Sequence, residues 1–358
     1  MHWIVFDNKT EWHQEVWENV LSYHVARRYC VLMTMLMLEL ILSKQKMVCF
    51  KVKWTSDGEA VLHINCWTDL KKDIKSKDTT VSEKEQDLVK EATKTAEFHN
   101  SEETLKQEAA KIAELLRKSE YCIAFTGSSA VKTNKSVYVE QLRPTYTHEA
   151  LVKLVEMNLI KFVISQNTDG LHRLSGIPKS QISELHGNSF TEKCEKCETR
   201  YERNHACRGK SSAVPAKKCD KCRINHRTGR VCDDKQCGGY LMNTIINFGD
   251  YLEDDVLGKA KENAEKADLV IALGTTLQVS PANSLVEMGK QPVRLVICNR
   301  QVTPYDNDCQ HGSRVYGDCD KLMRALMNAV LTKEELQAWE AKKDERMAQY
   351  DLQRVKIR

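Results

Sequence analysis

Residues 101–127 read SEETLKQEAAKIAELLRKSEYCIAFTG, which is a helix pattern followed by a strand pattern and a glycine. Ser101 can cap the helix, the next two residues are acidic, and apolar residues then recur at helical spacing. Those apolar residues are Leu105, Ala109, Ile112, Leu115 and Leu116. The apolar strand 121–125 ends in Thr126 and Gly127. The stretch therefore predicts a helix packed on a buried strand, with a polar turn at the carboxyl end of that strand.

Three further apolar strands repeat this plan at 162–165, 268–273 and 293–298. Each runs into a polar or glycine-bearing turn: Gln166-Asn167, Gly274-Thr275-Thr276 and Asn299-Arg300. Helical segments are expected between and after the strands, at 147–157, 254–266, 283–289 and 320–331. Buried strands that alternate with helices predict an α/β fold with a Rossmann-like open parallel sheet. Ligands of such sheets bind at the carboxyl ends of the strands.

The composition narrows the class of protein. The chain has 358 residues, 41% of them hydrophobic and 29% charged, which excludes a disordered or polytopic membrane protein. The net charge of +4 is too small to indicate nucleic-acid binding by itself. The start of the sequence has no secretory signal pattern, so we expect a protein that is not secreted. The apolar run 31–42 is shorter than the ~20 residues that cross a bilayer, and no membrane partner is expected.

Three cysteine pairs indicate an inserted zinc-binding module at residues 191–239. The pairs are Cys194-x2-Cys197, Cys219-x2-Cys222 and Cys232-x4-Cys237. Two pairs complete a closed tetrahedral site, so the spacing predicts one structural Zn²⁺, with six cysteines competing for four places. His205, Cys207 and His226 are taken as bystanders. The module carries thirteen Lys and Arg against seven Asp and Glu, which suits either an acidic partner or a solvated zinc lobe.

Two further motifs carry residue types that suit catalysis. Residues 166–172 read QNTDGLH directly after a strand, and their amide and carboxylate groups could hold sugar hydroxyls and a carboxamide; a turn closed by Asn and Asp is the alternative. The second motif is Glu184-Leu185-His186-Gly187. The imidazole of His186 suits general-base chemistry near neutral pH, whereas a purely structural histidine is the alternative.

Together these segments resemble the sirtuins, the NAD-dependent protein-lysine deacylase family. FTG, RPTYTHEAL, ISQNTDGLH, ELHG, the cysteine pairs, IINFGD, LGTTLQVSP and CNRQVTP follow one another within 101–331 as similar segments do in that family. The segments SGIPKSQISELHGN and NTIINFGD resemble most the sequences of the sirtuin-6/sirtuin-7 branch. The resemblance implies NAD-dependent transfer of the lysine acyl group to ADP-ribose, with release of nicotinamide.

The resemblance also implies roles for single residues. His186 is the catalytic base, and the zinc ligands are Cys194, Cys197, Cys232 and Cys237, which leaves the remaining pair in an insertion. The NAD contacts fall on Gly127, Gln166, Asn167, Asp169, Gly274, Thr275, Thr276, Asn299, Arg300, Gln301 and Cys319. The implied partner is an acylated histone or other nuclear protein, and the basic zinc lobe suits association with chromatin. The resemblance implies localisation in the nucleus, with the cytoplasm as the alternative.

The expected domains are an N-terminal extension at 1–100, a sirtuin-like catalytic domain at 101–332 and a charged tail at 333–358. Because the tail is rich in charged residues, we expect it to form an exposed helix. The catalytic domain has Rossmann-like parts at 101–190 and 240–332 on either side of the zinc module.

One departure from the family pattern follows Gly127. Sirtuins have a glycine-rich TGAGIS-type turn there and then a P-D-F/Y-R segment over NAD, and both are missing from this sequence. We therefore expect weak NAD binding and slow turnover. The alternatives are a catalytically inactive sirtuin-like interaction module and, from the basic lobe alone, a zinc-ribbon nucleic-acid binder.

Overall fold

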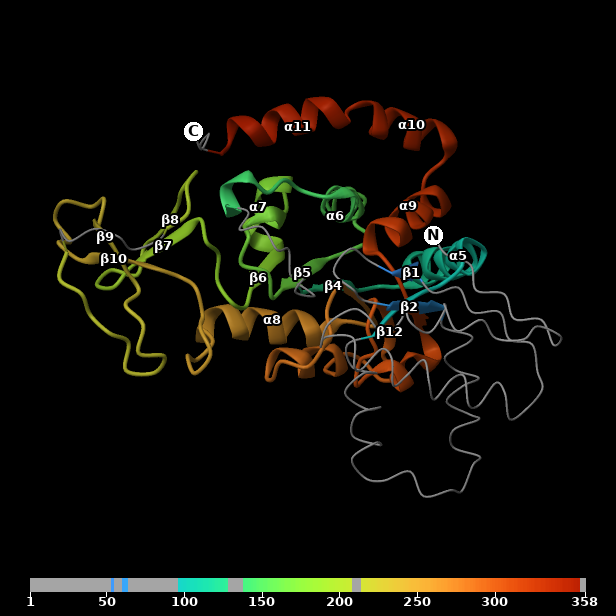
Figure 1. Ribbon diagram of the computed structural model, residues 1–358, viewed down its shortest axis with the longest axis horizontal. Coiled ribbons are helices and arrows are strands. Elements are labelled where there is room, and N and C mark those ends of the chain that lie inside the picture. Colours follow the sequence, from blue (N-terminus) through green and yellow to red (C-terminus); the bar gives the residue numbers. More distant parts are fainter. Residues whose placement is uncertain (1–52, 55–59, 64–95, 128–137, 208–213, 355–358) are drawn as a thin grey trace, which may run out of the picture. The chain divides into compact units, whose positions relative to one another are not determined.

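A computed structural model describes residues 53–54, 60–63, 96–127, 138–207 and 214–354 (Figure 1). The chain divides into two compact units, which are described separately. The first holds residues 1–104 with 299–303 and 316–318, and the second holds the rest. The apolar run 31–42 lies outside the described residues. Within the described ranges, every helix is too short or too polar to cross a bilayer.

The first unit contains a small sheet of the strands β1 (Lys53–Trp54), β2 (Ala60–His63) and β3 (Glu97–His99). The strands β1 and β2 pair antiparallel, and β3 joins β2 in parallel. The segment 299–303 lies against β3, where Phe98 N donates to Arg300 O at 2.9 Å. The Arg300 guanidinium also forms ion pairs with Glu97 and Asp318.

The second unit is built on a six-stranded sheet in the order β13-β12-β11-β4-β5-β6, and every pair of neighbours is parallel. Its strands are β4 (Cys122–Thr126), β5 (Phe162–Ser165), β6 (Ile182–Glu184), β11 (Leu269–Leu273), β12 (Arg294–Cys298) and β13 (Ser313–Val315). The predicted Rossmann-like parallel sheet is confirmed. The sequence patterns missed only the two edge strands, β6 and β13, which are too short to show a period. The chain leaves β4 for β5 on one side and later returns to β11 on the other, so a topological switch point lies between β4 and β11.

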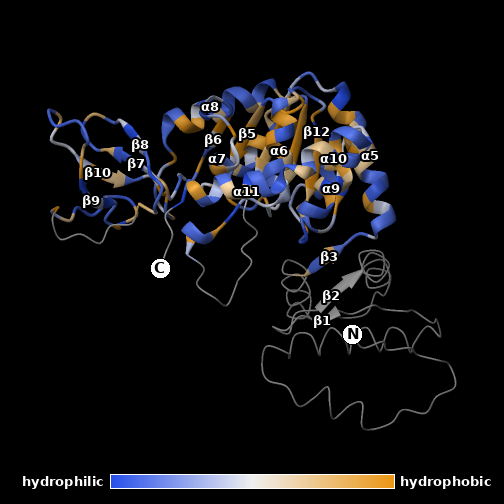
Figure 2. Cartoon of the chain, turned by 90° about the horizontal axis from the view of Figure 1, so that it is seen from above, coloured by the Kyte–Doolittle hydropathy of each residue, from blue (hydrophilic) through white to orange (hydrophobic). Residues whose placement is uncertain are grey.

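Helices cover both faces of this sheet (Figure 1). One face packs on α5 (Glu102–Lys118), α6 (Tyr146–Glu156) and α9 (Cys319–Val330), and the other on α8 (Asp254–Lys266) and a 3-10 helix at Ala282–Glu287. Alternate residues of each strand pack into the cores on the two faces of the sheet. In β4, Cys122 and Ala124 face the core beneath α5, α6 and α9, and Ile123 and Phe125 face the core beneath α8. Figure 2 shows the resulting concentration of hydrophobic residues in the strands. Burial on both faces explains why these strands are continuously apolar.

The C-terminal tail forms two helices rather than the single exposed helix expected, α10 (Lys333–Ala341) and α11 (Lys343–Leu352). They run along the outer side of α6 and α9 in Figure 1. The buried carboxylate of Glu149 on α6 accepts from Arg346 at 3.0 Å and from the Tyr350 hydroxyl at 3.3 Å. The charged tail is therefore attached to the second unit by a buried carboxylate.

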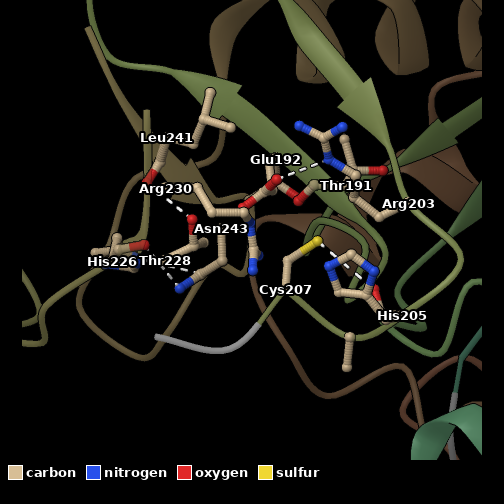
Figure 3. A network of polar contacts seen from close by, with 12 residues as sticks. Thr191, Glu192, Arg203, His205, Cys207, His226, Thr228, Arg230, Leu241 and Asn243 are labelled. Carbon is tan, nitrogen blue, oxygen red and sulfur yellow. Dashed lines mark hydrogen bonds and ion pairs between the residues drawn. The ribbon is translucent and has the colours of Figure 1, made fainter. Parts of the chain in front are cut away.

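The cysteine-rich insertion forms a separate antiparallel sheet in the order β8-β7-β10-β9. Its strands are β7 (Thr191–Cys194), β8 (Arg200–Glu202), β9 (Arg227–Val231) and β10 (Tyr240–Asn243). Figure 3 shows Glu192 of β7 between Arg203 and Arg230, whose Nε atoms each donate to it at 2.8 Å. Arg203 also makes two 3.0 Å bonds to the Asp233 carboxylate. Glu192 is fully buried, so its charge has to be balanced by these arginines. The ion-pair network connects β7 to β9 through Arg230, and to the C-x4-C loop through Arg203 and Asp233.

In the six-stranded sheet, Asp268 connects the amino-terminal ends of three strands, β4, β11 and β12. Its carboxylate accepts from the amides of Glu120 and Tyr121 just before β4, at 3.0 and 3.2 Å, and from Arg294 Nη2 at the start of β12, at 2.6 Å. Burial alone would raise the pKa of Asp268, but the hydrogen bonds from Ser119 and these amides, together with Arg294, hold it below its ordinary value of 3.8.

We predict that Asp268→Asn lowers the free energy of unfolding by about 2 kcal/mol at pH 7, because charge-assisted bonds are lost. The matched control is Asp255→Asn, whose side chain is 69% exposed. A carboxylate with a lowered folded-state pKa stabilises above its ordinary pKa of 3.8, and this contribution is lost as the pH falls through the folded-state value. Urea unfolding of both variants should therefore show a gap at pH 7 that narrows below pH 3.8. A gap that stays constant to the lowest pH would contradict this account.

Candidate functional site

The candidate site begins where β4 and β11 come closest, at the switch point. A Cβ built on Gly127 would stand 2.8 Å from Thr275 Cβ and 3.5 Å from Gln166 Nε2. Gln166 Nε2 itself donates to Thr275 Oγ1 at 3.4 Å. Three sequence-predicted residues from three separate turns are thus brought together, and only a glycine fits between them.

Asn167 and Asp169 follow Gln166 in the turn after β5. Asn167 Oδ1 is buried and has no hydrogen-bond partner within the described part of the chain. A buried acceptor without a donor is costly, and a bound ligand with an N–H group would satisfy it. One Asp169 oxygen accepts from Leu171 N at 2.9 Å, which closes a local turn just before the short helix α7 (Leu171–Ser175). The local-turn alternative thus holds for that oxygen of Asp169, whereas Asn167 has an unused acceptor.

His186 lies two residues beyond β6, one of the edge strands that the sequence analysis missed. Its Nδ1 is 3.1 Å from the Gln166 carbonyl, which can only accept, so Nδ1 carries the proton. The neutral ring therefore keeps its lone pair on Nε2. Burial lowers the pKa of His186, and the bond to Gln166 opposes this only in part. Gly187 follows with φ +80°, and a Cβ there would stand 1.8 Å from Thr244 O, so this position requires glycine.

A second histidine, the buried His172, contacts the last residue of β4, and it was not among the predicted site residues. His172 Nε2 is 2.8 Å from Thr126 Oγ1 at the end of β4, and its ring centroid is 4.7 Å from that of His148. Burial and the neighbouring His148 lower the pKa of His172 well below its ordinary value. The imidazole rings of His148 and His172 are therefore both uncharged at neutral pH. The sequence signal was present, because His172 ends the QNTDGLH motif.

The remaining predicted cofactor contacts lie in two places. Gly274 (φ +61°) follows β11, where a Cβ would stand 3.1 Å from Gly127 O and 3.6 Å from Cys319 Sγ. Thr276 is half-buried in the same turn. Asn299, Arg300 and Gln301 belong to the first unit, where Asn299 Nδ2 donates to Gln301 O at 3.0 Å. The second unit thus gathers all the predicted cofactor residues except these three.

NAD fits the chemistry of the second-unit residues. A dinucleotide carries amide, hydroxyl and phosphate groups. Here the turn after β5 holds a buried amide oxygen without a partner among the described residues, and two glycines lie in the turns after β4 and β11, at the topological switch point. The backbone can approach a phosphate closely at such glycines.

Four cysteine sulfurs of the insertion lie within 4.8 Å of one another: Cys194, Cys197, Cys232 and Cys237. Cys194 Sγ is 3.6 Å from Cys237 Sγ, and Cys197 Sγ is 3.7 Å from Cys232 Sγ. A tetrahedral ion with bonds of about 2.3 Å to sulfur requires sulfur–sulfur distances of about 3.8 Å. The cluster therefore fits Zn²⁺. Its members are the four that the resemblance implied.

A protein-family model described as the Sir2 family matches residues 102–281. The chain belongs to the Sir2 family. Within the Sir2 family, the chain is similar to curated deacetylases from plants and animals. NAD-dependent protein deacetylase SRT1 of Oryza sativa subsp. indica is 33% identical over 255 residues, which is 64% of this chain and 50% of that protein. NAD-dependent protein deacetylase sirtuin-7 of Bos taurus is 33% identical over 257 residues, or 63% and 60%.

NAD-dependent protein deacetylase Sirt6 of Drosophila melanogaster is 32% identical over 235 residues, or 59% of this chain and 72% of that protein. The predicted similarity to the sirtuin-6/sirtuin-7 branch is confirmed. The chain spans only 50% to 60% of the rice and cattle relatives. A solved structure described as Sir2-p53 peptide-NAD+ aligns over 64% of this chain and 98% of that chain, at 26% identity and a TM-score of 0.45. The fold assignment depends on the strand order and not on this alignment.

Proposed function

We propose that this Sir2-family chain is an NAD-dependent protein-lysine deacetylase or deacylase that acts on histones or other nuclear proteins. The observation that carries the proposal is the orientation of His186, whose Nδ1–H donates to the carbonyl of Gln166. The next residue in the chain is Asn167, whose buried Oδ1 has no partner among the described residues. A positioned neutral imidazole suits general-base catalysis. The unfilled acceptor of Asn167 suits a ligand that carries an N–H group. The rice and cattle relatives of the chain are named NAD-dependent protein deacetylases.

The proposed cofactor contacts follow from the residue chemistry and the resemblance. When bound, NAD would supply the anomeric ribose carbon that the acyl oxygen attacks, the nicotinamide that departs from this carbon, and the ribose hydroxyl to which the acyl group then moves. Asn167 Oδ1 accepts from a carboxamide N–H, and Gly127 and Gly274 allow backbone contact with phosphate. The other proposed contacts are Gln166, Asp169, Thr275 and Thr276 on the ribose and phosphate side, and Asn299, Arg300, Gln301 and Cys319 on the adenosine side.

His186 is the proposed base. Its Nε2 takes a proton from a ribose hydroxyl, while the bond from Nδ1 to Gln166 O keeps the ring in the required tautomer. Because the pKa of His186 lies below its ordinary value of 6.5, the ring is uncharged and able to accept this proton at neutral pH.

The proposed metal group is structural. Cys194, Cys197, Cys232 and Cys237 would hold one Zn²⁺ by four thiolates, which leaves no open position for substrate. The metal would therefore maintain the antiparallel sheet and take no part in acyl transfer.

We also propose that the insertion contributes to chromatin association. Several of its arginines are paired internally, including Arg203 with Glu192 and Arg227 with Glu195. Among the described residues, the charge available to an acidic partner includes the exposed lysines Lys217, Lys218 and Lys221.

The first test is a deacetylation assay with an acetyl-lysine peptide and NAD. We predict that His186→Ala lowers turnover about 10²- to 10⁴-fold, the usual contribution of a general base, and leaves the melting temperature unchanged. His311→Ala, at an exposed histidine, is the matched control. In the unsubstituted chain, the acid limb of the rate profile should have its midpoint below pH 6.5. The role of His186 is wrong if a folded His186→Ala variant keeps full NAD-dependent turnover.

The segment after Gly127 bears on how active the chain is. Residues 128–137 lie outside the described residues, so the proposal rests on the sequence, which lacks the family's TGAGIS-type turn and P-D-F/Y-R segment. We propose that NAD binding is weakened and turnover slowed, because contacts to a charged ligand lose strength in a wet, open site. One missing charge-assisted contact costs about 1.5–3 kcal/mol, or roughly ten- to a hundredfold in affinity. The same departure favours a second candidate, a catalytically inactive interaction module.

The loop proposal predicts a gain of function on repair. A variant with a family-like TGAGIS…PDYRG segment after Phe125 should bind NAD roughly ten- to a hundredfold more tightly and deacetylate faster. Calorimetric titration with NAD and the peptide assay measure the two effects. Equal affinity and rate in the natural and repaired chains would refute the loop argument, whereas turnover only in the repaired chain would identify the natural chain as the inactive module.

A further inference from the structure

A second cysteine knuckle, Cys219–Ile224, repeats the backbone of the first, Cys194–Thr199. In both, the amide two residues after the first cysteine donates to the cysteine sulfur at 3.4 Å. The amide four residues on donates to the cysteine carbonyl at 3.0 and 3.1 Å, and the cysteine amide donates to the carbonyl five residues on at 3.0 and 2.9 Å. The residue four positions after the first cysteine has a positive φ in both knuckles, +60° at Glu198 and +64° at Arg223. The second pair therefore has the same metal-binding backbone as the first.

This knuckle faces two further donors. Cys222 Sγ lies 3.1 Å from His226 Nε2, and Cys219 Sγ lies 3.3 Å from Asp250 Oδ1. His226 Nε2 and Asp250 Oδ2 are 3.5 Å apart, and one donor atom of each of the four residues lies within 4.8 Å of the others. We infer that Cys219, Cys222, His226 and Asp250 bind a second zinc ion, separate from the four-cysteine site.

Neighbouring groups orient these donors toward a common point. Asn243 Nδ2 donates to His226 O at 3.1 Å, which turns Asn243 Oδ1 toward His226 Nδ1 at 3.3 Å (Figure 3). Nδ1 therefore carries the proton, and Nε2 is left to bind metal. The Asp250 carboxylate is fixed by the amides of Cys222 and Asn247, at 3.2 and 3.0 Å. Such outer hydrogen bonds are typical of metal sites.

The donor set selects the ion. Two thiolates and one imidazole favour zinc over magnesium or calcium, and four donors complete a tetrahedron. Three of the four residues line a cavity of about 470 Å³, which gives an ion a path from solvent. His226 was expected to be a bystander, although the C-x2-C-x3-H spacing is visible in the sequence. Asp250 lies 24 residues further on, where no sequence pattern connects it to the cysteines.

The metal content of the purified full-length chain tests the inference. We expect two zinc ions per chain, falling to one in Cys222→Ser and in His226→Ala. Cys232→Ser should also retain one, because it removes only the other site. Cys207→Ser is the matched control, since Cys207 is a buried cysteine of the same module outside both clusters, and it should keep two. One zinc in the unsubstituted chain, or two in His226→Ala, overturns the second site.

A second experiment replaces zinc by Co²⁺ and does not depend on how well the cysteine and histidine variants fold. The chain is loaded with Co²⁺, and Asp250→Asn, a nearly isosteric change, is compared with the unsubstituted chain. The inferred site predicts that Asp250→Asn alters the visible d–d bands while the absorption from the four-thiolate site stays. Identical spectra and equal cobalt content contradict it. A single zinc lost with Cys219→Ser but kept in Cys232→Ser would overturn both this site and the proposed four-cysteine site.

Discussion

Gly127 and Thr275 lie at the ends of two adjacent parallel strands, so close that even one methyl group on Gly127 would displace Thr275. This approach follows from the register, in which Thr126 faces Leu273 at the last pair of the ladder. Because β5 pairs with β4 on its other side, Gln166 enters the same small volume and can bond to Thr275. Gln166 O in turn orients His186. The geometry of the catalytic candidate thus depends on the packing at the centre of the sheet.

Burial explains which parts of the fold could be predicted. Central strands such as β11 have both faces buried, so their composition alone marks them. The edge strands β6 and β13 have three residues each, and tertiary pairing rather than local sequence specifies them. The tail was predicted to be exposed because it is highly charged. Its contacts with the buried Glu149 depend on long-range ion pairing that no local pattern reveals.

The site was predictable where a motif follows a strand, as at Gln166 and Thr275. It was not predictable where side chains meet through the fold: Thr126 with His172, or Cys219 with Asp250. At Asp169 the residue type predicts more than the structure offers. Its carboxylate suits a ligand, yet one of its two oxygens is already bonded to the amide of Leu171. Residue type and spacing therefore identify candidates, and hydrogen bonding decides which donors and acceptors are still available.

The most direct test of the switch-point site is the melting temperature with and without NAD. A ligand that binds only the folded chain raises it. The account predicts a rise for the unsubstituted chain and for Gly258→Ala, where a Cβ meets no atom within 4 Å. It predicts no rise for Gly127→Ala, whose methyl group would occupy the space between Thr275 and Gln166. An equal rise in Gly127→Ala, or none in the unsubstituted chain at any NAD concentration, would contradict it.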